Sequence, residues 1–372
     1  MKKHVILISL LLLALLAGCA SPAPASPEPT ETAAPAPTPE PTPEPTPEPP
    51  SFVVLAGETA EEILALADNP NLREVDGTAS AETEALAALQ RLRPDCAVRY
   101  TFDWRGTPLP SDTAELTITE AEGAEEALRC LPLLRRVDMR AVDWSVGDME
   151  RFEELYPAID FIWTLHFGSW TVPSDITCFS TLRTGEPGNH RYTNDELYPL
   201  LRFGHHLRAL DLGHNALTDL TLIGQMPELQ VLILADNDTL TDISPLSELS
   251  ELWYLELFLC RNVEDFSPLC SLTRLRDLNL SYDGYFGDLS FLANCPDFEN
   301  GWFRNTGVTR EQADAFLAAH PGVTLIVGSP RDPSSTAFGW RETERNAAIR
   351  HAFTYWPTVV DWRGWDDIEY AP

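Results

Sequence analysis

The sequence predicts an α/β solenoid, a stack of short coils in which parallel strands line one side and short helices or 3-10 turns line the other. Three observations predict it. Four stretches begin at Leu207, Leu229, Leu252 and Leu275, which lie 22, 23 and 23 residues apart. Apolar residues occupy positions 1, 4 and 6 of each stretch, and a small polar or weakly polar residue occupies position 9. Fixed periods of about 20–29 residues with this spacing are typical of stacked repeats.

The apolar positions predict stacking because one coil cannot bury its own leucines without a neighbour on each side. Position 9 falls at a turn, where a side chain must satisfy backbone groups that water does not reach. The residues in this column, including a weaker fifth coil from Phe298, are Asn215, Asn237, Cys260, Asp283 and Thr306.

The return arms of the coils repeat as well. TDISPLSELSE (241–251), EDFSPLCSLTR (264–274) and GDLSFLANCPD (287–297) align Ser244, Ser267 and Ser290. Serine and proline suit the first turn of a short helix, so we expect a short helix or 3-10 turn in each return arm.

The whole motif, LxxLxLxxNxL followed by DISPLxxL, resembles the short leucine-rich repeats of bacterial internalin-type surface proteins. The similar stretch covers about 207–308, and it departs from the pattern where position 9 lacks asparagine in three of five coils. The resemblance implies a right-handed leucine-rich-repeat solenoid with parallel strands on the concave face, used for binding.

The region 51–206 predicts longer, irregular coils with an internal duplication. PDCAVRYTFDWRGTPLPSD (94–112) aligns with PAIDFIWTLHFGSWTVPSD (157–175) at an offset of 63 residues, and helical patterns precede both (82–93 and 148–156). A third copy of helix, proline and strand occupies 310–328. We interpret these residues as one solenoid with the regular repeats of 207–328. The alternative is a separate, duplicated α/β domain.

The segment 329–372 breaks the period, and we expect it to form a C-terminal cap, because the end of a solenoid exposes core. It contains a helical apolar face of Ala348, Ile349, Ala352 and Phe353. The alternative is a binding patch built from the tryptophans of this segment, which are Trp340, Trp356, Trp362 and Trp365.

The N-terminus predicts a lipoprotein signal peptide over 1–18. Two lysines precede an apolar run from Val5 to Ala17, which is too short for an ordinary membrane span. The residues Leu16 to Cys19 resemble a bacterial lipobox, which implies cleavage before Cys19 and lipidation of its thiol. An ordinary cleaved signal peptide or an uncleaved anchor is the alternative. The rest of 19–50 is rich in proline, glutamate and threonine, which predicts a disordered spacer.

The formal charge of −31 argues against nucleic acid and anionic lipid as partners of the folded part. We expect a monomer at the extracytoplasmic face of a cell membrane, held by its N-terminal lipid. Six cysteines remain besides Cys19, without a CxxC or zinc spacing. Cys260 and Cys295 align with interior columns and are predicted to be buried thiols.

No strong catalytic or cofactor signal appears, and we predict no catalytic residue, no metal and no cofactor. His206 and His214 lie at opposite ends of a predicted strand, too far apart for one metal ion. The best calcium candidate is the run of Asp236, Asn237 and Asp238, but no calcium-binding loop pattern surrounds it. The duplicated Pro-Ser-Asp at 110–112 and 173–175 has the composition of a structural turn.

The functional prediction rests on strand positions that point away from the leucine core. In the third to fifth coils these positions combine aromatic and charged side chains, which is the composition of binding hot spots. The predicted ligand-binding residues of the concave face are Tyr254, Glu256, Phe258, Asp277, Tyr282, Trp302 and Arg304. The alternatives are cover by the C-terminal segment and ordinary solvated scatter.

We therefore predict a membrane-anchored binding protein that recognises a protein, ahead of a glycan, with its repeat surface. The alternative function is a cell-envelope enzyme or glycan-processing accessory with a site in the irregular region 94–206. That alternative predicts carboxylates converging in a pocket.

Overall fold

A computed structural model of the chain describes residues 49–183, 190–329, 339 and 343–355. The predicted signal peptide, the lipidation site Cys19 and the four tryptophans of the C-terminal segment lie outside these residues. Residues 49–372 form one compact unit, separate from 1–48. The boundaries drawn from the sequence within 49–372 stay a prediction.

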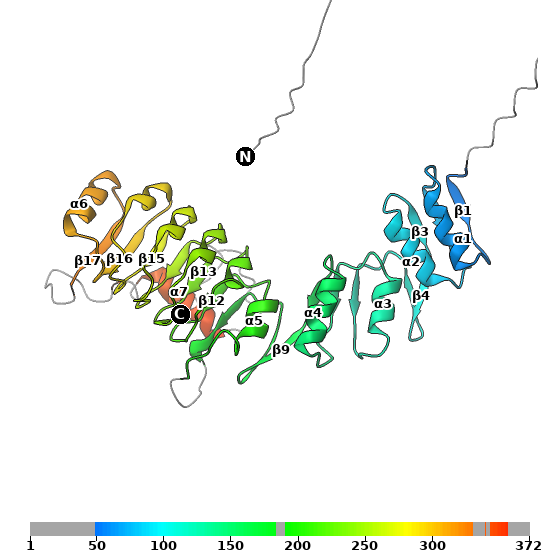
Figure 1. Ribbon diagram of the computed structural model, residues 1–372, viewed down its shortest axis with the longest axis horizontal. Helices are drawn as coiled ribbons and strands as arrows, with labels where there is room; N and C mark the ends of the chain where they lie inside the picture. Colours follow the sequence, from blue (N-terminus) through cyan, green and yellow to red (C-terminus); the bar gives the residue numbers. More distant parts are fainter. Residues whose placement is uncertain (1–48, 184–189, 330–338, 340–342, 356–372) are drawn as a thin grey trace, which may run out of the picture. The chain divides into compact units, whose positions relative to one another are not determined.

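The first coils contain three parallel strands with helices between them (Figure 1). A hairpin of two further strands follows. The sheet order is β1-β2-β3, and the hairpin pairs β4 with β5. The elements are β1 (Phe52–Val54), α1 (Ala60–Ala65), a 3-10 turn (Leu66–Asp68), β2 (Glu74–Asp76), α2 (Thr83–Leu92), β3 (Ala97–Arg99), β4 (Thr101–Trp104) and β5 (Thr107–Pro110).

The next coils repeat this arrangement at the offset found in the sequence. Helix α2 and helix α4 lie 63 residues apart, and so do strands β3 and β8. The second set contains β6 (Glu115–Thr117), α3 (Ala124–Cys130), β7 (Arg136–Asp138), α4 (Val146–Leu155), β8 (Asp160–Ile162), β9 (Thr164–Phe167) and β10 (Trp170–Pro173). The Tyr100 hydroxyl donates a buried hydrogen bond of 2.6 Å to the Cys130 carbonyl, which joins the two sets.

The regular repeats form a parallel sheet of seven strands in chain order, β11 to β17. Each strand pairs with the next in the register that the leucine pattern predicts, so Leu210, Leu232, Leu255 and Leu278 align across the sheet. The strands are β11 (Cys178–Ser180), β12 (Ala209–Asp211), β13 (Val231–Ile233), β14 (Tyr254–Glu256), β15 (Asp277–Asn279), β16 (Asn300–Arg304) and β17 (Thr324–Gly328).

Short helical segments return the chain between these strands, as the serine and proline columns predict. Three of the return arms are 3-10 turns that begin at the aligned serines. The segments are α5 (Tyr198–Phe203), η3 (Ile223–Gln225), η4 (Ser244–Glu248), η5 (Ser267–Ser271), η6 (Ser290–Asn294) and α6 (Arg310–Ala319).

One apolar core runs from the second set of coils through the regular repeats, and its leucines are buried. Leu232, Leu255 and Leu278, which define the interior register, are each 0% exposed. Cys260 and Cys295 lie in this core as predicted, and no disulfide joins the cysteines of the described residues.

The turns after β12 to β16 adopt a left-handed backbone at position 8 of the repeat. The φ angle there lies between 51° and 73°, and none of these residues is glycine. They are His214, Asp236, Leu259, Tyr282 and Asn305. This conformation is uncommon for residues with a side chain, and it recurs because the chain must turn sharply into the polar column of position 9.

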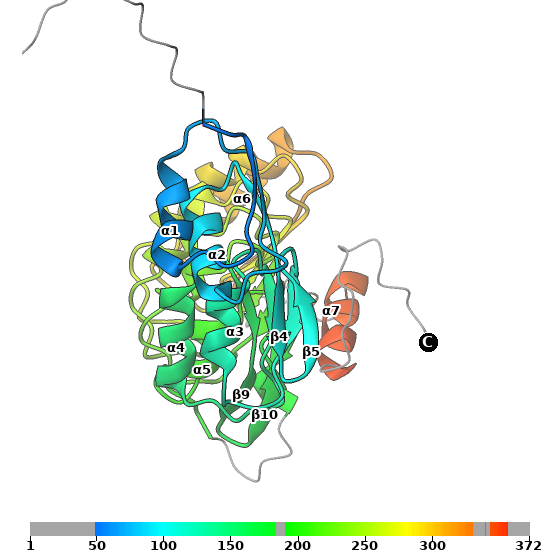
Figure 2. The ribbon, with the colours of Figure 1, turned by 90° about the vertical axis from the view of Figure 1, so that its right-hand side faces the viewer.

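Helix α7 (Glu344–Tyr355) lies on the face of the seven-stranded sheet opposite the return helices (Figure 2). Its apolar face packs against outward-pointing residues of β11 to β14. The helix expected to cap the end of the solenoid therefore covers the concave face.

Candidate functional site

The concave face is built by strand residues that alternate with the leucines of the core. In β14 and β15, Leu255 and Leu278 point inward, and their neighbours Tyr254, Glu256 and Asp277 point to the opposite side. The predicted orientation of the concave residues agrees with this register.

The exposure predicted for this face is wrong for five of the seven candidate residues. Their exposed fractions lie between 1% for Asp277 and 7% for Arg304. The buried five are Tyr254, Glu256, Asp277, Trp302 and Arg304. For Tyr254, Glu256 and Asp277 the physical reason is contact with helix α7, which corresponds to the alternative of cover by the C-terminal segment.

Phe258 and Tyr282 remain half-buried at the ends of the strands. Their rings meet edge to face, with centroids 5.5 Å apart. Aromatic pairs of this geometry are rigid and present both apolar surface and, through tyrosine, a polar group. They are the two residues of the predicted patch that stay partly exposed.

Helix α7 is attached to the concave face by ion pairs at its N-terminal end. Arg345 donates to the Asp277 carboxylate at 2.8 Å and to the Glu299 carboxylate at 2.5 Å. Asn300 donates a further bond of 2.7 Å to Asp277. Burial raises the pKa of Asp277, and the Arg345 charge opposes that rise.

A second polar contact lies one residue further along the helix. The Asn346 amide donates to the Tyr254 hydroxyl at 2.8 Å and approaches the Glu256 carboxylate at 3.5 Å. The Tyr254 hydroxyl in turn donates to Glu256. Burial and the adjacent Glu256 charge raise the pKa of Tyr254 well above its ordinary value, so the phenol stays protonated and acts as a donor.

The apolar half of the contact lies toward the C-terminal end of α7. Ile349 is fully buried, and Ala352 and Phe353 are nearly so. They form a cluster of their own with residues from β11 to β14, separate from the leucine core. The sheet residues of this cluster are Cys178, Ala209, Val231, Ile233, Ala235, Trp253 and Tyr254.

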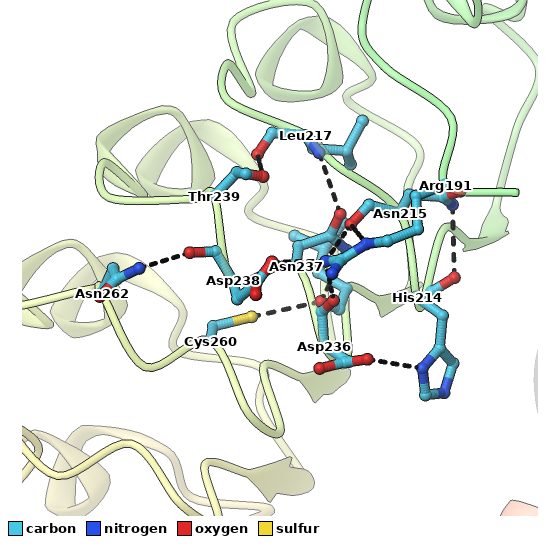
Figure 3. A network of polar contacts seen from close by, with 12 residues as sticks. Arg191, His214, Asn215, Leu217, Asp236, Asn237, Asp238, Thr239, Cys260 and Asn262 are labelled. Atoms are coloured by element: carbon cyan, nitrogen blue, oxygen red, sulfur yellow. Dashed lines mark hydrogen bonds and ion pairs between the residues drawn. The ribbon is translucent and has the colours of Figure 1, made fainter. Parts of the chain in front are cut away.

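The polar column of position 9 is structural. Asn237 donates from one amide nitrogen to the carbonyls of Leu212 and Leu234, both at 2.9 Å, and accepts from the Leu217 amide (Figure 3). Asn215 and Cys260 make equivalent bonds to carbonyls at position 6. The bonds from Asn237 to Leu212 and from Cys260 to Leu234 each join a coil to the one before it.

The calcium candidate is occupied by protein groups. Asp236 accepts from His214 at 2.9 Å, and Asp238 accepts from Arg191 at 2.6 Å (Figure 3). Arg191 also donates to the Asn215 carbonyl. Within the described ranges, no group of three or more histidine, cysteine, aspartate or glutamate side chains is arranged to hold a metal ion.

The irregular region contains a groove of about 700 Å³ between α4, the start of β8 and the end of α5. It contains four carboxylates, as the alternative function predicts. Its lining residues are Glu150, Glu153, Glu154, Pro157, Ile159, Asp160, Phe161, Arg202 and His205.

The chemistry of the groove is that of ion pairing. Glu153 accepts from Arg202 at 2.7 Å and from the Trp163 indole at 3.3 Å. Burial raises the pKa of Glu153, but the hydrogen bond to His205 and the charge of Arg202 outweigh it and hold that pKa below its ordinary value. A general acid requires a raised pKa, so Glu153 is poorly suited to that role.

The histidines do not converge. His206 pairs with Asp160 at 3.0 Å beside the groove, and His214 lies exposed at the turn after β12. Asp175 of the second Pro-Ser-Asp pairs with Arg136. The serines of both copies are buried and accept backbone N–H groups from Tyr100 and Trp163, which confirms the predicted structural turn.

Sequence reasoning missed the residues of α7 that define the site. The apolar residues Ile349 and Phe353 were recognised as one helical face, but their target was not. Arg345 and Asn346 carried no signal of their own. The signal available was complementarity: an arginine near the start of an amphipathic helix, and acidic residues at outward positions of neighbouring strands.

The fold is a leucine-rich-repeat solenoid, and the comparisons agree with it. A family model described as "Leucine Rich repeats (2 copies)" matches residues 205–248. No curated protein matches the chain in sequence.

Several solved structures are similar to the chain. Internalin C2 from Listeria monocytogenes is 23% identical, with 59% of this chain and 77% of that chain covered and a TM-score of 0.30. Internalin F from Listeria monocytogenes is 18% identical, over 75% and 80% of the two chains, with a TM-score of 0.25. A chain of the Rad7 and Elc1 complex in yeast is 15% identical, over 77% and 73%, with a TM-score of 0.32. These similarities concern the fold alone.

Proposed function

We propose that this chain is a lipid-anchored, extracytoplasmic binding protein that recognises a protein partner with the concave side of its repeats. The observation that carries the proposal is the occupied concave face. An amphipathic helix lies there, held by ion pairs at one end and by an apolar cluster at the other. A surface that binds a helix within its own chain has the shape and chemistry to bind protein.

The scaffold supports recognition because its coils are fixed before binding. The bonds of Asn237 and Cys260 join three successive coils, and the leucines of the core are buried between the coils, so the side chains of the concave side lose little conformational entropy when a partner docks. Repeat proteins of this kind typically use extended concave surfaces for binding. The acidic composition favours a basic partner.

The proposed anchor rests on the sequence. Cys19 follows a short apolar run, and a proline-rich spacer separates it from the first strand at Phe52. A spacer of this composition stays extended and keeps the folded part away from the membrane surface.

The test is saturable binding of the full-length protein to surface proteins fractionated from candidate cells, measured by biolayer interferometry. Phe258→Ala and Tyr282→Ala remove the half-buried aromatic pair, and we expect at least a tenfold loss of affinity in each. Tyr285→Ala is the matched control, because this tyrosine is 61% exposed on the opposite side. The proposal would be contradicted if Phe258→Ala and Tyr282→Ala both left binding unchanged, or if no saturable binding were found.

A further inference from the structure

We infer that the concave face is a receptor for an amphipathic helix and that α7 is a ligand-like helix held in cis, which a helix of the partner displaces. The partner helix carries an arginine near its start and an apolar stripe at the spacing of Ile349, Ala352 and Phe353. The inference rests on the proposed function and specifies the kind of partner. The geometry of α7 carries it.

The first argument is the direction of the helix. Arg345 contacts Asp277 on β15, and the other end of α7 packs on Cys178 of β11. The helix therefore crosses strands that are successive in the sheet and belongs to no coil of the stack. Helices that belong to the solenoid return the chain between neighbouring strands, as α5 and α6 do. Helix α7 instead occupies the position of a bound helix in a groove.

The second argument is charge. Outward positions of the neighbouring strands β14 and β15 carry Glu256 and Asp277, which are 2% and 1% exposed. A cluster of buried carboxylates is unfavourable unless cations and donors satisfy it. Arg345 and Asn346 supply such groups from α7. A replacement helix must supply them too, so the face selects a helix with a cation near its N-terminal end.

The third argument is that the contact is incomplete. The Oδ1 atom of Asn346 and the Nδ2 atom of Asn279 are buried, and neither has a hydrogen-bond partner among the described residues. Asn279 lies beside Glu256 in the register of the sheet. Buried polar groups are nearly always paired in stable interfaces. A partner helix that pairs with Asn279 therefore binds this face better than α7 does.

Covalent attachment explains how an imperfect helix remains bound. Helix α7 has twelve residues, and an isolated helix of that length is marginal in water. Its tether to β17 gives it a high effective concentration at the face. The tether holds α7 in place when no partner is present, and a tighter helix in solution outcompetes it.

The experiment uses a fluorescein-labelled peptide of residues 343–355 and the full-length chain. Ile349→Asp removes the fully buried anchor of α7 and leaves the face vacant. We expect this variant to bind the peptide at least tenfold more tightly than the wild-type chain does, by fluorescence anisotropy. Leu155→Asp is the matched control, since the same charge is placed on a leucine that is 58% exposed on α4. A peptide of scrambled order controls for composition.

A second variant covers the case in which Ile349→Asp does not fold. Arg345→Glu breaks both ion pairs without touching the apolar cluster, and it gives the same expected gain in peptide binding. The peptide carrying Arg345→Glu should bind at least tenfold more weakly to the face of the Ile349→Asp chain, and the addition of Asp277→Arg to that chain should restore its binding. Circular dichroism confirms that each variant is folded.

Two outcomes would overturn the inference. One is a folded, vacant variant that binds the peptide no better than the wild-type chain does. The other is a wild-type dimer that dissociates on Arg345→Glu, because the bound helix would then belong to a second copy. If the vacant face does not bind the peptide but Phe258→Ala still weakens binding of the partner, this inference is wrong and the proposed function stands. If the vacant face binds the peptide but Phe258→Ala leaves binding of the partner unchanged, the proposed function is wrong.

Discussion

Asp283 occupies the position of the repeat where other coils place an amide or a thiol. It is fully buried, and neither carboxylate oxygen has a hydrogen-bond partner among the described residues. Asn237 occupies the same position two coils earlier. It donates to two carbonyls, which an ionised carboxylate cannot do. Burial raises the pKa of Asp283 to about 9, so at neutral pH the group is a neutral acid and keeps one donor.

Replacing Asp283 by asparagine should stabilise the protein at neutral and alkaline pH. The folded-state pKa lies above the unfolded value, so the stability that the protonated acid contributes is complete below the unfolded pKa near 4. It is lost as pH rises toward 9. We expect Asp283→Asn to raise the free energy of unfolding at pH 8 by about 2 kcal/mol. Urea unfolding from pH 5 to 9 measures it.

The matched control is Asp297→Asn, an exposed aspartate in the neighbouring return arm, which should change little. Asn237→Asp should introduce the same loss of stability with rising pH in another coil, because Asn237 is also fully buried. Equal pH profiles for the wild-type chain and Asp283→Asn would contradict this account of the column.

His206 provides a second prediction with a titration. The hydrogen bond to Asp160 raises the pKa of His206 above its ordinary value. The stability from this pair is complete below pH 6.5 and is lost as pH rises through the folded-state pKa. We expect the imidazole to titrate above 6.5 by NMR, and Asp160→Asn to lower that pKa. An unchanged titration in Asp160→Asn would show that the pair does not set it.

At the scale of residues, the sequence predicted the buried leucines and the polar column because both follow the repeat period. It did not predict the left-handed turn at position 8. Leu259 and Tyr282 adopt positive φ there, and neither residue type favours it. The turn is imposed by the stacking of neighbouring coils, which propensity does not record.

At the scale of elements, the duplicated hairpins share one structural device. The hydroxyl of Ser174 accepts the backbone N–H of Trp163 at 2.9 Å, and the hydroxyl of Ser111 accepts that of Tyr100 at 3.3 Å. Each serine therefore anchors a hairpin to the strand that precedes it. The shared composition of the two turns follows from this shared contact.

Removing this anchor should destabilise the second hairpin. Ser174→Ala leaves the buried Trp163 amide without its acceptor, which costs on the order of 1–3 kcal/mol. Ser169→Ala, an exposed change at the tip of the same hairpin, is the control and should lie within about 0.5 kcal/mol of the wild-type chain. Thermal unfolding by calorimetry measures both. Equal effects of the two changes would show that the serine is not an anchor.

Most elements were predicted because their patterns are local. Helices predicted at 82–93 and 148–156 are observed at Thr83–Leu92 and Val146–Leu155. The position of α7 was not predictable in the same way. Its apolar face was visible in the sequence. Its position on the concave face, and not at the solenoid end, depends on contacts with strands that are distant in the chain. Phe353, for example, belongs to one apolar cluster with Cys178 of β11, which lies 175 residues away.

At the scale of the whole molecule, the candidate site illustrates the same limit. The orientation of Tyr254 and Asp277 follows from strand alternation, but their burial depends on a helix from a distant segment. Among the described residues, none of the helices has the length and apolar composition needed to cross a bilayer. Membrane attachment through Cys19 remains a proposal.

The proposed anchor makes a direct prediction. Cys19→Ala removes the thiol that would carry the lipid, and we expect the protein to move from the membrane fraction to the soluble extracytoplasmic fraction. Metabolic labelling with a radioactive fatty acid should mark the wild-type chain and leave Cys19→Ala unlabelled. Cys270→Ala is the control, because this cysteine is exposed in the folded part and lies outside the lipobox. Labelling of both variants would contradict lipidation at Cys19.

The last coil of the stack has a particular consequence for local opening. Among the described residues, strand β17 ends the sheet and pairs with β16 alone, and α7 spans the earlier strands β11 to β15. In a one-dimensional stack, a coil with one neighbour opens at the lowest free energy. Local opening should therefore start at Thr324–Gly328. It should be slower at the strands that α7 contacts, because the helix holds several of them together. Backbone amides of β13 should exchange with deuterium long after those of β17.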